Sequence, residues 1–348
     1  MKKKILFVTT WFMRWWAEKQ IYHILNWLKD KYQIKIVGFV DWYYKEEYKK
    51  LWIEVAYVPL KSQLSFPKAV YQTNKIVKIF NPDIIQSFLP HANIVTKFVN
   101  AFNLWKYTVL TWFRNSHIPE SLWKLEKYTE RFCKKIITNS HTNKDILTKR
   151  WFDENKIKVI YNWFDYVDPK EKYDFEKKTI LTVGKLRDQK DYPTNIKTAK
   201  KLLEYRNDFQ FLYVGEEWDW YEKLQELINQ YWMQNYIKIL WKRDDIPELM
   251  SSCDIFFLPT KFEWQANVLM EAMYYGLPIV TTDIPENREI CDWFFEEIWD
   301  YKALAKDVND ILDGKKDCED KLKNNKEFIK KFTIDSMIEK YLEVYDDV

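Results

Sequence analysis

The chain has 348 residues, enough for two domains of ordinary size. Apolar residues make up 47% and charged residues 31%, which is typical of a folded, soluble protein and excludes a disordered or collagen-like one. The 55 basic and 52 acidic side chains leave a formal net charge of +3. That balance argues against a nucleic-acid-binding protein, because such proteins usually have a clear basic excess.

Short apolar strands alternate with helical patterns through the first half of the chain. Strands are predicted at residues 5–10, 33–40, 83–88, 107–111, 135–139 and 157–161, and an amphipathic helix at residues 17–29. Because these strands are continuously apolar and are separated by helices, they predict a parallel sheet covered on both faces.

A polar, charged stretch at residues 165–178 interrupts this series and is the best candidate for a linker. A second series of strands follows at residues 179–184, 209–215, 236–240, 253–259 and 278–283, and a last helix is predicted at about residues 333–345. We expect an α/β protein with two Rossmann-like, doubly wound domains that face each other across a cleft. The expected domain bounds are 1–168 and 169–332. A C-terminal helix is expected at 333–348, and one arrangement for it is packing back on the first domain. In such sheets ligands bind beyond the carboxyl ends of the strands.

Neither membrane spans nor disulfides are indicated. No apolar run approaches the ~20 residues that a membrane span needs. The first apolar stretch meets Arg14, Glu18 and Lys19 too soon for a signal peptide. The cysteines show no paired metal-ligand spacing, so we expect reduced thiols in a cytoplasmic protein at Cys133, Cys253, Cys291 and Cys318.

The strongest local signal follows the strand at residues 253–259. A polar loop holds Glu263, Asn267 is a candidate N-cap, and residues 268–275 form a short helix that contains Glu271. The N–H groups and positive dipole at the start of that helix suit a diphosphate, and the two glutamates could reach different parts of one ligand. Taken alone, the glutamates are more often an ordinary surface pair.

Two lysines form the second signal, in the loop after the strand at residues 179–184. Lys185 and Lys190 lie between this strand and a helix, where cations could neutralise a diphosphate leaving group. Taken alone, the loop is more often simply a solvated basic segment.

Taken in order, these segments resemble the retaining glycosyltransferases of family 4, which have the GT-B fold. The family's Gly-Arg-Leu, followed after three residues by Lys, corresponds to Gly184-Lys-Leu and Lys190, with lysine in place of arginine. Its two glutamates separated by seven residues and followed by alanine correspond to Glu263 and Glu271. The resemblance extends over nearly the whole chain.

The resemblance implies roles for individual residues. Lys185 and Lys190 would bind the donor diphosphate, Glu271 the ribose and Glu263 the donor sugar, with backbone N–H groups near residues 267–269 supporting the phosphates. The implied donor-binding residues are Gly184, Lys185, Lys190, Asn267, Val268, Leu269 and Glu271.

Other implied residues lie in the first domain. His91 corresponds to a family histidine near the reacting centre and joins Glu263 as a candidate catalytic residue; a helix-capping or core role for His91 stays open. Arg114 and His117 would line the acceptor side, and a structural role is equally open for both.

The implied activity is that of a retaining hexosyltransferase that needs no metal and no other cofactor. It would move a sugar from a UDP- or GDP-linked donor to a glycan or lipid-linked acceptor in polysaccharide biosynthesis. Peripheral contact with the inner face of a membrane is compatible with such an acceptor. Two alternatives remain, namely a non-catalytic nucleotide-sugar-binding protein of the same fold and a sugar-nucleotide epimerase.

The composition has one abnormal feature. The chain has 5 glycines and 18 tryptophans, which together number 23. An average soluble protein has about 7% glycine, which would be about 24 residues here. Tryptophan stands at several positions where the family has glycine: Trp15, Trp16, Trp163, Trp241, Trp264 and Trp293.

Two hypotheses account for these tryptophans. Indoles at Trp15, Trp16 and Trp264 would crowd the expected phosphate and sugar sites, so we expect glycine at these loop positions. A UGA codon translated here as tryptophan but decoded in the cell as glycine would produce this pattern. The rival hypothesis is a tryptophan-rich protein that uses Trp15 and Trp16, with Arg14 and Lys19, as an anchor at a membrane interface.

Overall fold

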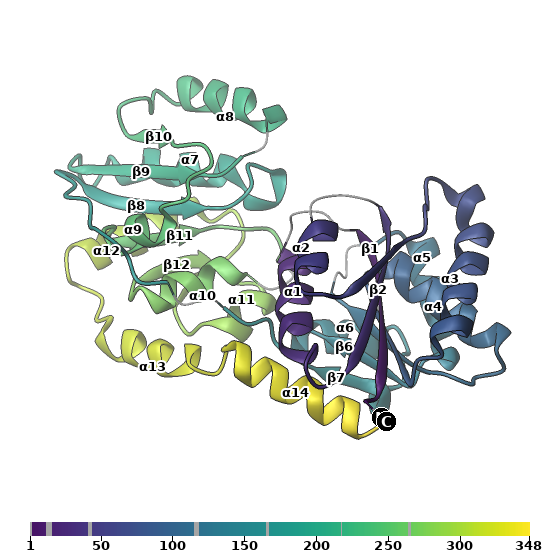
Figure 1. The fold of residues 1–348 in the computed structure, drawn as a ribbon. Helices are drawn as coiled ribbons and strands as arrows, with labels where there is room; N and C mark the ends of the chain where they lie inside the picture. The colour runs from purple at the N-terminus through teal and green to yellow at the C-terminus, as the bar shows by residue number, and fades with distance from the viewer. Residues whose placement is uncertain are drawn as a thin grey trace. The chain divides into compact units, whose positions relative to one another are not determined.

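The computed structural model describes residues 2–11, 16–40, 44–114, 118–164, 167–216, 218–263 and 266–348. The chain forms two compact units, one of Met1–Trp163 with Ile334–Val348 and one of Phe164–Thr333. Figure 1 shows that each unit is built around one sheet with helices on both of its faces.

The first boundary lies after Trp163, rather than after residue 168 as predicted. Residues just beyond it pack along the second unit: the N–H of Lys170 donates to Glu248 Oε1 at 3.2 Å, and that of Tyr173 donates to Ser252 Oγ at 2.8 Å. The polar stretch expected to be a linker is therefore partly attached to the second unit. The last helix, α14 (Ile334–Asp346), belongs to the first unit.

The first sheet has seven parallel strands in the order β3-β2-β1-β4-β5-β6-β7. Ile5 of β1 pairs with Ile34 of β2 on one side and with Ile84 of β4 on the other. Ile5 faces one hydrophobic core and Leu6 faces another, which is why the strand is apolar without interruption. The strands are β1 Lys4–Trp11, β2 Gln33–Val40, β3 Glu54–Tyr57, β4 Ile84–Phe88, β5 Thr108–Phe113, β6 Lys135–Thr138 and β7 Ile157–Val159.

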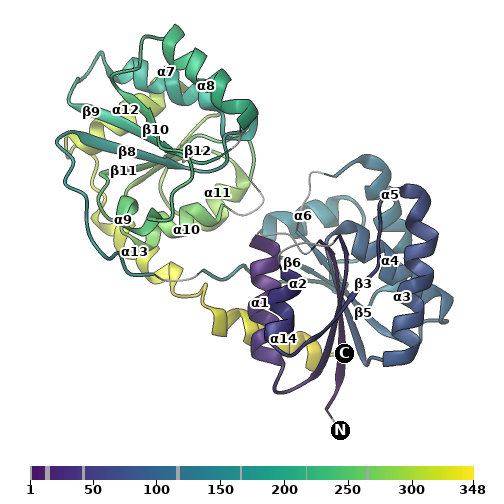
Figure 2. The ribbon, with the colours of Figure 1, turned by 45° about the horizontal axis from the view of Figure 1, so that its top comes forward.

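Helices cover both faces of the first sheet, as Figure 2 shows. α1 and α14 pack on one face through residues such as Ile21 and Ile338, and α3, α4 and α5 pack on the other through Val77, Val95 and Trp123. The helices are α1 Trp16–Leu28, α2 Tyr44–Lys50, α3 Phe66–Phe80, α4 Pro90–Phe102, α5 Glu120–Thr129 and α6 His141–Lys149, besides α14.

The second sheet has six parallel strands in the order β10-β9-β8-β11-β12-β13. The strands are β8 Lys178–Val183, β9 Phe209–Val214, β10 Ile237–Ile239, β11 Ile255–Leu258, β12 Ile279–Thr282 and β13 Phe294–Glu296. The helices are α7 Tyr192–Leu202, α8 Trp218–Gln230, α9 Ile246–Met250, α10 Asn267–Tyr274, α11 Pro285–Ile290, α12 Tyr301–Leu312 and α13 Glu319–Ile329.

Both sheets are doubly wound. In the first, the chain runs outward from β1 through β2 to β3, and then from β4 in the opposite direction. In the second, it runs from β8 through β9 to β10 and then from β11 in the opposite direction. Each sheet therefore has a topological switch point, between β1 and β4 and between β8 and β11, where doubly wound proteins bind their ligands.

The predicted strands all occur, and the last helix is shifted by one residue from its predicted bounds. β3 and β13 were not predicted, because both are short edge strands whose residues are partly exposed and lack a continuous apolar run. Within the described residues, no helix combines the length and the apolar character needed to cross a membrane.

Candidate active site

A buried ion pair occupies the switch point of the second sheet. Lys190 ends a short 3₁₀ turn after β8, and Glu263 lies in the loop after the neighbouring strand β11. Lys190 Nζ lies 2.6 Å from Glu263 Oε1, and both side chains are largely withdrawn from solvent. Because an unpaired buried charge is costly, each charge makes the burial of the other tolerable.

Three polar groups hold the Glu263 carboxylate in place. Thr260 Oγ1 lies 3.0 Å from Oε1, and Gln189 Nε2 donates to Oε2 at 3.2 Å. Gln189 Nε2 also donates to the carbonyl of Phe262 at 2.8 Å, which fixes the loop as well as the carboxylate. With Lys190, these contacts supply hydrogen bonds to both carboxylate oxygens.

The loops after β8, β11 and β12 are tied together at this point. The N–H of Thr260 donates to Thr282 Oγ1 at 3.0 Å, and the N–H of Lys261 donates to the carbonyl of Gln189 at 2.9 Å. Burial raises the pKa of Glu286, at the start of α11, and the negative charge of Glu263 raises it further. Glu286 therefore lies within the electrostatic reach of the ion pair.

Gly184, at the end of β8, and Gly215, after β9, are closely packed. A Cβ at Gly184 would lie 2.9 Å from Lys190 Cε, and a Cβ at Gly215 would lie only 1.8 Å from the carbonyl oxygen of Gly184. The loops after β8 and β9 thus approach one another through two glycines. Lys185, the next residue, is exposed.

Helix α10 begins at Asn267, one residue earlier than predicted. The capping position is Ala266, whose methyl group offers no hydrogen-bond acceptor, so the predicted N-cap role of Asn267 is wrong. Asn267 and Val268 are partly exposed in the first turn, while Leu269 is buried.

Glu271, in the second turn of α10, is partly exposed. Burial raises the pKa of Tyr275 well above its ordinary value, and the negative charge of Glu271 adds to that shift. The helix ends where Leu277 N–H donates to the carbonyl of Ala272 at 3.0 Å and Gly276 takes a φ of 72°.

Several residues that support Lys190 were not predicted. Asn195 Nδ2 donates to the carbonyl of Lys190 at 3.1 Å, and Thr194 Oγ1 donates to Asp191 Oδ2 at 2.7 Å. Gln189 and Thr260 were also missed. Both lie in loops that follow predicted strands, and this was the available signal, since loops at the carboxyl ends of adjacent parallel strands lie close together.

His91 lies at the switch point of the first sheet, in the first turn of α4 after β4. Its side chain is exposed at the surface. Partial removal of water from the ring lowers the pKa of His91, and the negative charge of Glu126 opposes that change. The imidazole is therefore largely neutral at pH 7.

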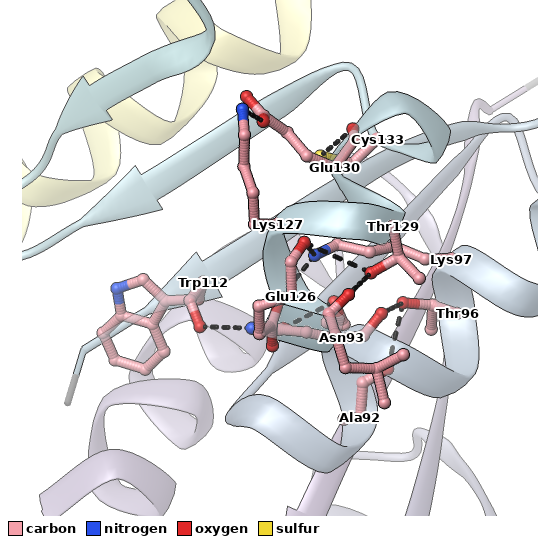
Figure 3. A network of polar contacts seen from close by, with 12 residues as sticks. Ala92, Asn93, Thr96, Lys97, Trp112, Glu126, Lys127, Thr129, Glu130 and Cys133 are labelled. Carbon is pink, nitrogen blue, oxygen red and sulfur yellow. Dashed lines mark hydrogen bonds and ion pairs between the residues drawn. The ribbon is translucent and has the colours of Figure 1, made fainter. Parts of the chain in front are cut away.

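Hydrogen bonds fix the helix that carries His91. Ser87 Oγ of β4 donates to Asn93 Oδ1 at 2.8 Å, and Asn93 Nδ2 donates to the carbonyl of Trp112 at 3.0 Å. Figure 3 shows Asn93 reaching Trp112 and, farther along α4, Lys97 paired with Glu126 of α5. These contacts hold the start of α4 against β4 and β5.

Arg114 follows β5 and its guanidinium lies over the ring of Trp112 at 5.4 Å. Burial lowers the pKa of Arg114 to about 10, and the negative charge of Glu18 opposes that change. Within the described residues Arg114 Nη1 has no hydrogen-bond partner.

Four predicted positions cannot be placed in the site. Trp15, His117 and Trp264 lie outside the described residues, and only the backbone of Trp16, the first residue of α1, is described. In the part of the chain that the structure describes, no group of three His, Cys, Asp or Glu side chains could hold a metal ion.

Both halves of the chain match models of one class of proteins. Residues 17–167 match the family described as Glycosyltransferase Family 4, and residues 167–328 match Glycosyl transferases group 1.

Two curated relatives have names of the same class. An uncharacterized glycosyltransferase of Methanocaldococcus jannaschii is 24% identical over 313 residues, covering 81% of this chain and 75% of the relative. The UDP-Gal:alpha-D-GlcNAc-diphosphoundecaprenol alpha-1,3-galactosyltransferase of Escherichia coli is 25% identical over 253 residues, covering 64% of this chain and 63% of that protein.

Solved structures match over nearly the whole chain. A glycosyltransferase of Rickettsia africae has a TM-score of 0.86 at 20% identity, covering 99% of this chain and 98% of that one. Anabaena HepE, solved with UDP, has a TM-score of 0.85 at 18% identity, covering 99% of this chain and 100% of that one. At these identities the structural likeness shows the fold, and the family models show the class. The chain is therefore a member of the group 1 glycosyltransferases and has the GT-B fold.

Proposed function

We propose that this glycosyltransferase moves a hexose from a UDP- or GDP-linked donor to a glycan or lipid-linked acceptor, with retention of the anomeric configuration and without a metal ion. The observation that carries the proposal is the Lys190–Glu263 pair, a fixed cation and a fixed carboxylate at the switch point of the second sheet. A donor needs such a combination, because its diphosphate is anionic and its sugar offers hydroxyl donors.

Lys190 would neutralise the diphosphate as it leaves. An ammonium has three N–H donors, and Glu263 accepts one of them at 2.6 Å. The remaining donors can turn to phosphate oxygens while the pair with Glu263 fixes the stem of the lysine. A cation held in place before the reaction stabilises developing negative charge at no cost of reorganisation.

Helix α10 supplies the second source of positive charge. Its first turn, at Asn267, Val268 and Leu269, carries the positive dipole end that favours a phosphate group, although the N–H of Leu269 already donates to the carbonyl of Ala266 at 2.8 Å. Together with Lys185 and Lys190, the helix would do the work that other transferases assign to a metal ion. Glu271, one turn further along, would accept hydrogen bonds from the ribose.

The sugar and the acceptor complete the assignment. Glu263, already oriented by Gln189, would accept hydrogen bonds from donor sugar hydroxyls. His91, whose pKa is lowered by partial removal of water, would lie near the reacting centre and act as a neutral hydrogen-bonding group. The donor's own phosphate would serve as base for the acceptor hydroxyl, and Arg114 and His117 would line the acceptor side.

A lipid-linked acceptor would bring the protein to the inner face of a membrane, with the donor supplied from the cytoplasm. The E. coli relative supports this acceptor class, because its name specifies a diphosphoundecaprenol-linked sugar. Fractionation of cells that contain the protein, with and without a salt wash, tests for peripheral attachment.

Incubation with a panel of UDP- and GDP-sugars, with glycan and lipid-linked acceptors, tests the activity. We expect transfer that survives a chelator, and a product whose anomeric configuration matches the donor by NMR. Binding of a nucleotide sugar without turnover in the presence of diverse acceptors would instead favour a non-catalytic binding protein. Interconversion of the donor sugar would favour an epimerase.

A further inference from the structure

Tryptophans recur at backbone positions that suit glycine. Among the described residues, ten non-glycine residues have a positive φ, and six of them are tryptophans. Positive φ is uncommon for any residue with a side chain and is an outlier for a bulky one, because the Cβ crowds the backbone. The six are Trp52, Trp105, Trp151, Trp232, Trp241 and Trp299, with φ between 47° and 73°.

Three of these tryptophans end helices in one and the same way. After α6, Trp151 N–H donates to the carbonyl of Thr148 at 2.9 Å, and Phe152 N–H donates to that of Leu147 at 3.1 Å. With φ at 66° for Trp151, this pair of bonds is the Schellman motif, whose left-handed residue is usually glycine.

Trp232 after α8 repeats the pattern. Its N–H donates to the carbonyl of Asn229 at 3.1 Å, and the N–H of Met233 donates to the carbonyl of Ile228 at 2.9 Å. Trp52 after α2 repeats it as well, with its N–H on the carbonyl of Lys49 at 2.9 Å.

Glycine occupies the same position at two other helix ends. Gly276 after α10 has a φ of 72°, and its N–H donates to the carbonyl of Met273 at 3.2 Å. Gly314 after α12 has a φ of 68°, and its N–H donates to that of Ile311 at 3.0 Å. One helix-ending geometry is therefore occupied by glycine at two ends and by tryptophan at three.

The three indoles gain no packing that would offset the backbone strain. Trp52 is 96% exposed, Trp151 is 85% exposed and Trp232 is 79% exposed. Removal of these side chains would leave the hydrophobic cores intact and would relieve the crowding of Cβ at positive φ.

Trp123 provides the contrast. It lies inside α5, is 3% exposed, and its ring stands 4.8 Å from that of Phe113 and 4.2 Å from the guanidinium carbon of Arg150. Glycine there would leave a large cavity in the core and weaken the helix. The structure requires a large side chain at this position.

We propose that the native protein carries glycine at positions 52, 151 and 232 and tryptophan at position 123. UGA is read as tryptophan in one variant genetic code and as glycine in another. A cell that reads UGA as glycine and UGG as tryptophan would produce this division. The backbone geometry supports the inference independently of any likeness to other proteins.

The inference also bears on the donor site, and this step rests on the proposed function. The family resemblance implies glycine at positions 15, 16 and 264, for close approach to phosphate and sugar. If the same codon specifies them, the native chain carries no indole at these positions, and the rival interpretation of Trp15 and Trp16 as a membrane anchor fails.

Peptide mass spectrometry of the protein purified from its own cells tests the proposal without any assay of activity. We expect peptides with glycine at positions 52, 151 and 232 and with tryptophan at position 123. Peptides with an indole at the three helix ends would overturn the proposal, whatever the outcome of transfer assays. Glycine at position 123 would overturn the distinction between the exposed helix ends, which suit glycine, and the buried position in α5, which requires a large side chain.

Recombinant variants give a second test. From the chain as printed, Trp52→Gly, Trp151→Gly and Trp232→Gly should each raise the Tm, on the order of 2–4 °C. Trp123→Gly is the matched control and should lower the Tm. A lower Tm in each of the three helix-end variants would contradict the structural argument.

Discussion

Two lysine–glutamate pairs are buried within the described residues, and they differ in where the chain places them. Lys97 and Glu126 join two helices, α4 and α5, inside the first unit, as Figure 3 shows. Lys190 and Glu263 join two loops at the carboxyl ends of neighbouring strands in the second unit. The chemical groups are the same, so under the proposed function the position of each pair in the sheet topology decides which pair meets the donor.

The contacts that surround the two ion pairs also differ. Lys97 Nζ also contacts the backbone carbonyl of Glu126 at 3.3 Å, and both side chains are almost fully buried. The carboxylate of Glu263 is instead held by side chains from two loops, Gln189 and Thr260. The first arrangement fastens a helix, whereas the second orients a carboxylate and an ammonium.

Lys97→Met should have the largest effect on stability, because it leaves Glu126 charged and buried. We expect the free energy of unfolding to fall by about 3–5 kcal/mol, measured by urea denaturation. Lys330→Met, which breaks an exposed pair with Glu327, is the control and should change stability by less than about 1 kcal/mol. The double variant Lys97→Met with Glu126→Leu should recover most of that loss. Unchanged stability of Lys97→Met alone would contradict the contrast drawn between the two ion pairs.

Lys190→Met should act mainly on the reaction. We expect kcat/KM to fall by roughly 10²–10³-fold, because the variant loses a prepositioned cation at the leaving group. Lys306→Met, which removes a surface lysine paired with Asp310, should leave kcat/KM unchanged. A comparison of Tm values separates lost folding from lost catalysis. Normal turnover by folded Lys190→Met would remove Lys190 from the donor site.

Two glycines sharpen the comparison, since Gly184 lies beside Lys190 and Gly215 lies against the backbone of Gly184. Gly215→Ala would bring a Cβ to 1.8 Å from the backbone oxygen of Gly184, so the two loops must separate. We expect a loss of stability of about 1–3 kcal/mol by denaturation. Gly276→Ala meets nothing within 4 Å but keeps a φ of 72°, and should cost about 1 kcal/mol. Equal costs for the two variants would contradict the close approach.

The strands on which the second site depends could be predicted, because β8, β11 and β12 consist mostly of buried apolar or β-branched residues. The lysine and glutamate themselves could be named only through the resemblance to a family. Their contact could not be derived from spacing, since 73 residues separate Lys190 from Glu263 and only the adjacency of β8 and β11 brings them together.

Other features depended on backbone detail that composition does not specify. Asn267 is a good N-cap residue by type, yet the helix begins at Asn267 itself and Ala266 takes the cap position. The abnormal number of tryptophans was evident in the sequence, whereas the positive φ angles at Trp52, Trp151 and Trp232 required coordinates. The contact between Lys97 and Glu126 was not predicted, because each residue lies in a helix without a local signal for burial.

Glu296, a partly buried carboxyl group, gives the smallest expected effect and tests whether each such carboxylate needs a cation of its own. Glu296 at the end of β13 shares its surroundings with Asp307 of α12, whose charge is paired with Lys316 at 2.6 Å. Burial, and then the negative charge and hydrogen bond of Asp307, raise the pKa of Glu296 to about 7.

The direction of the resulting pH dependence follows from proton binding. Between the ordinary glutamate pKa of about 4.3 and the raised value, the folded protein holds a proton that the unfolded chain has lost. This group's contribution to stability is therefore fully present below about pH 4 and is lost as the pH rises through 7. Because Glu296 is partly exposed, we expect less than about 1 kcal/mol. Glu296→Gln should flatten the fall in Tm between about pH 5 and 8, relative to Glu327→Gln at an exposed site. If both variants keep the parent protein's change of Tm with pH, Glu296 makes no contribution to that change. The charges of Asp307 and Lys316 would then balance each other without Glu296, and the Glu296 carboxyl group would need no cation of its own.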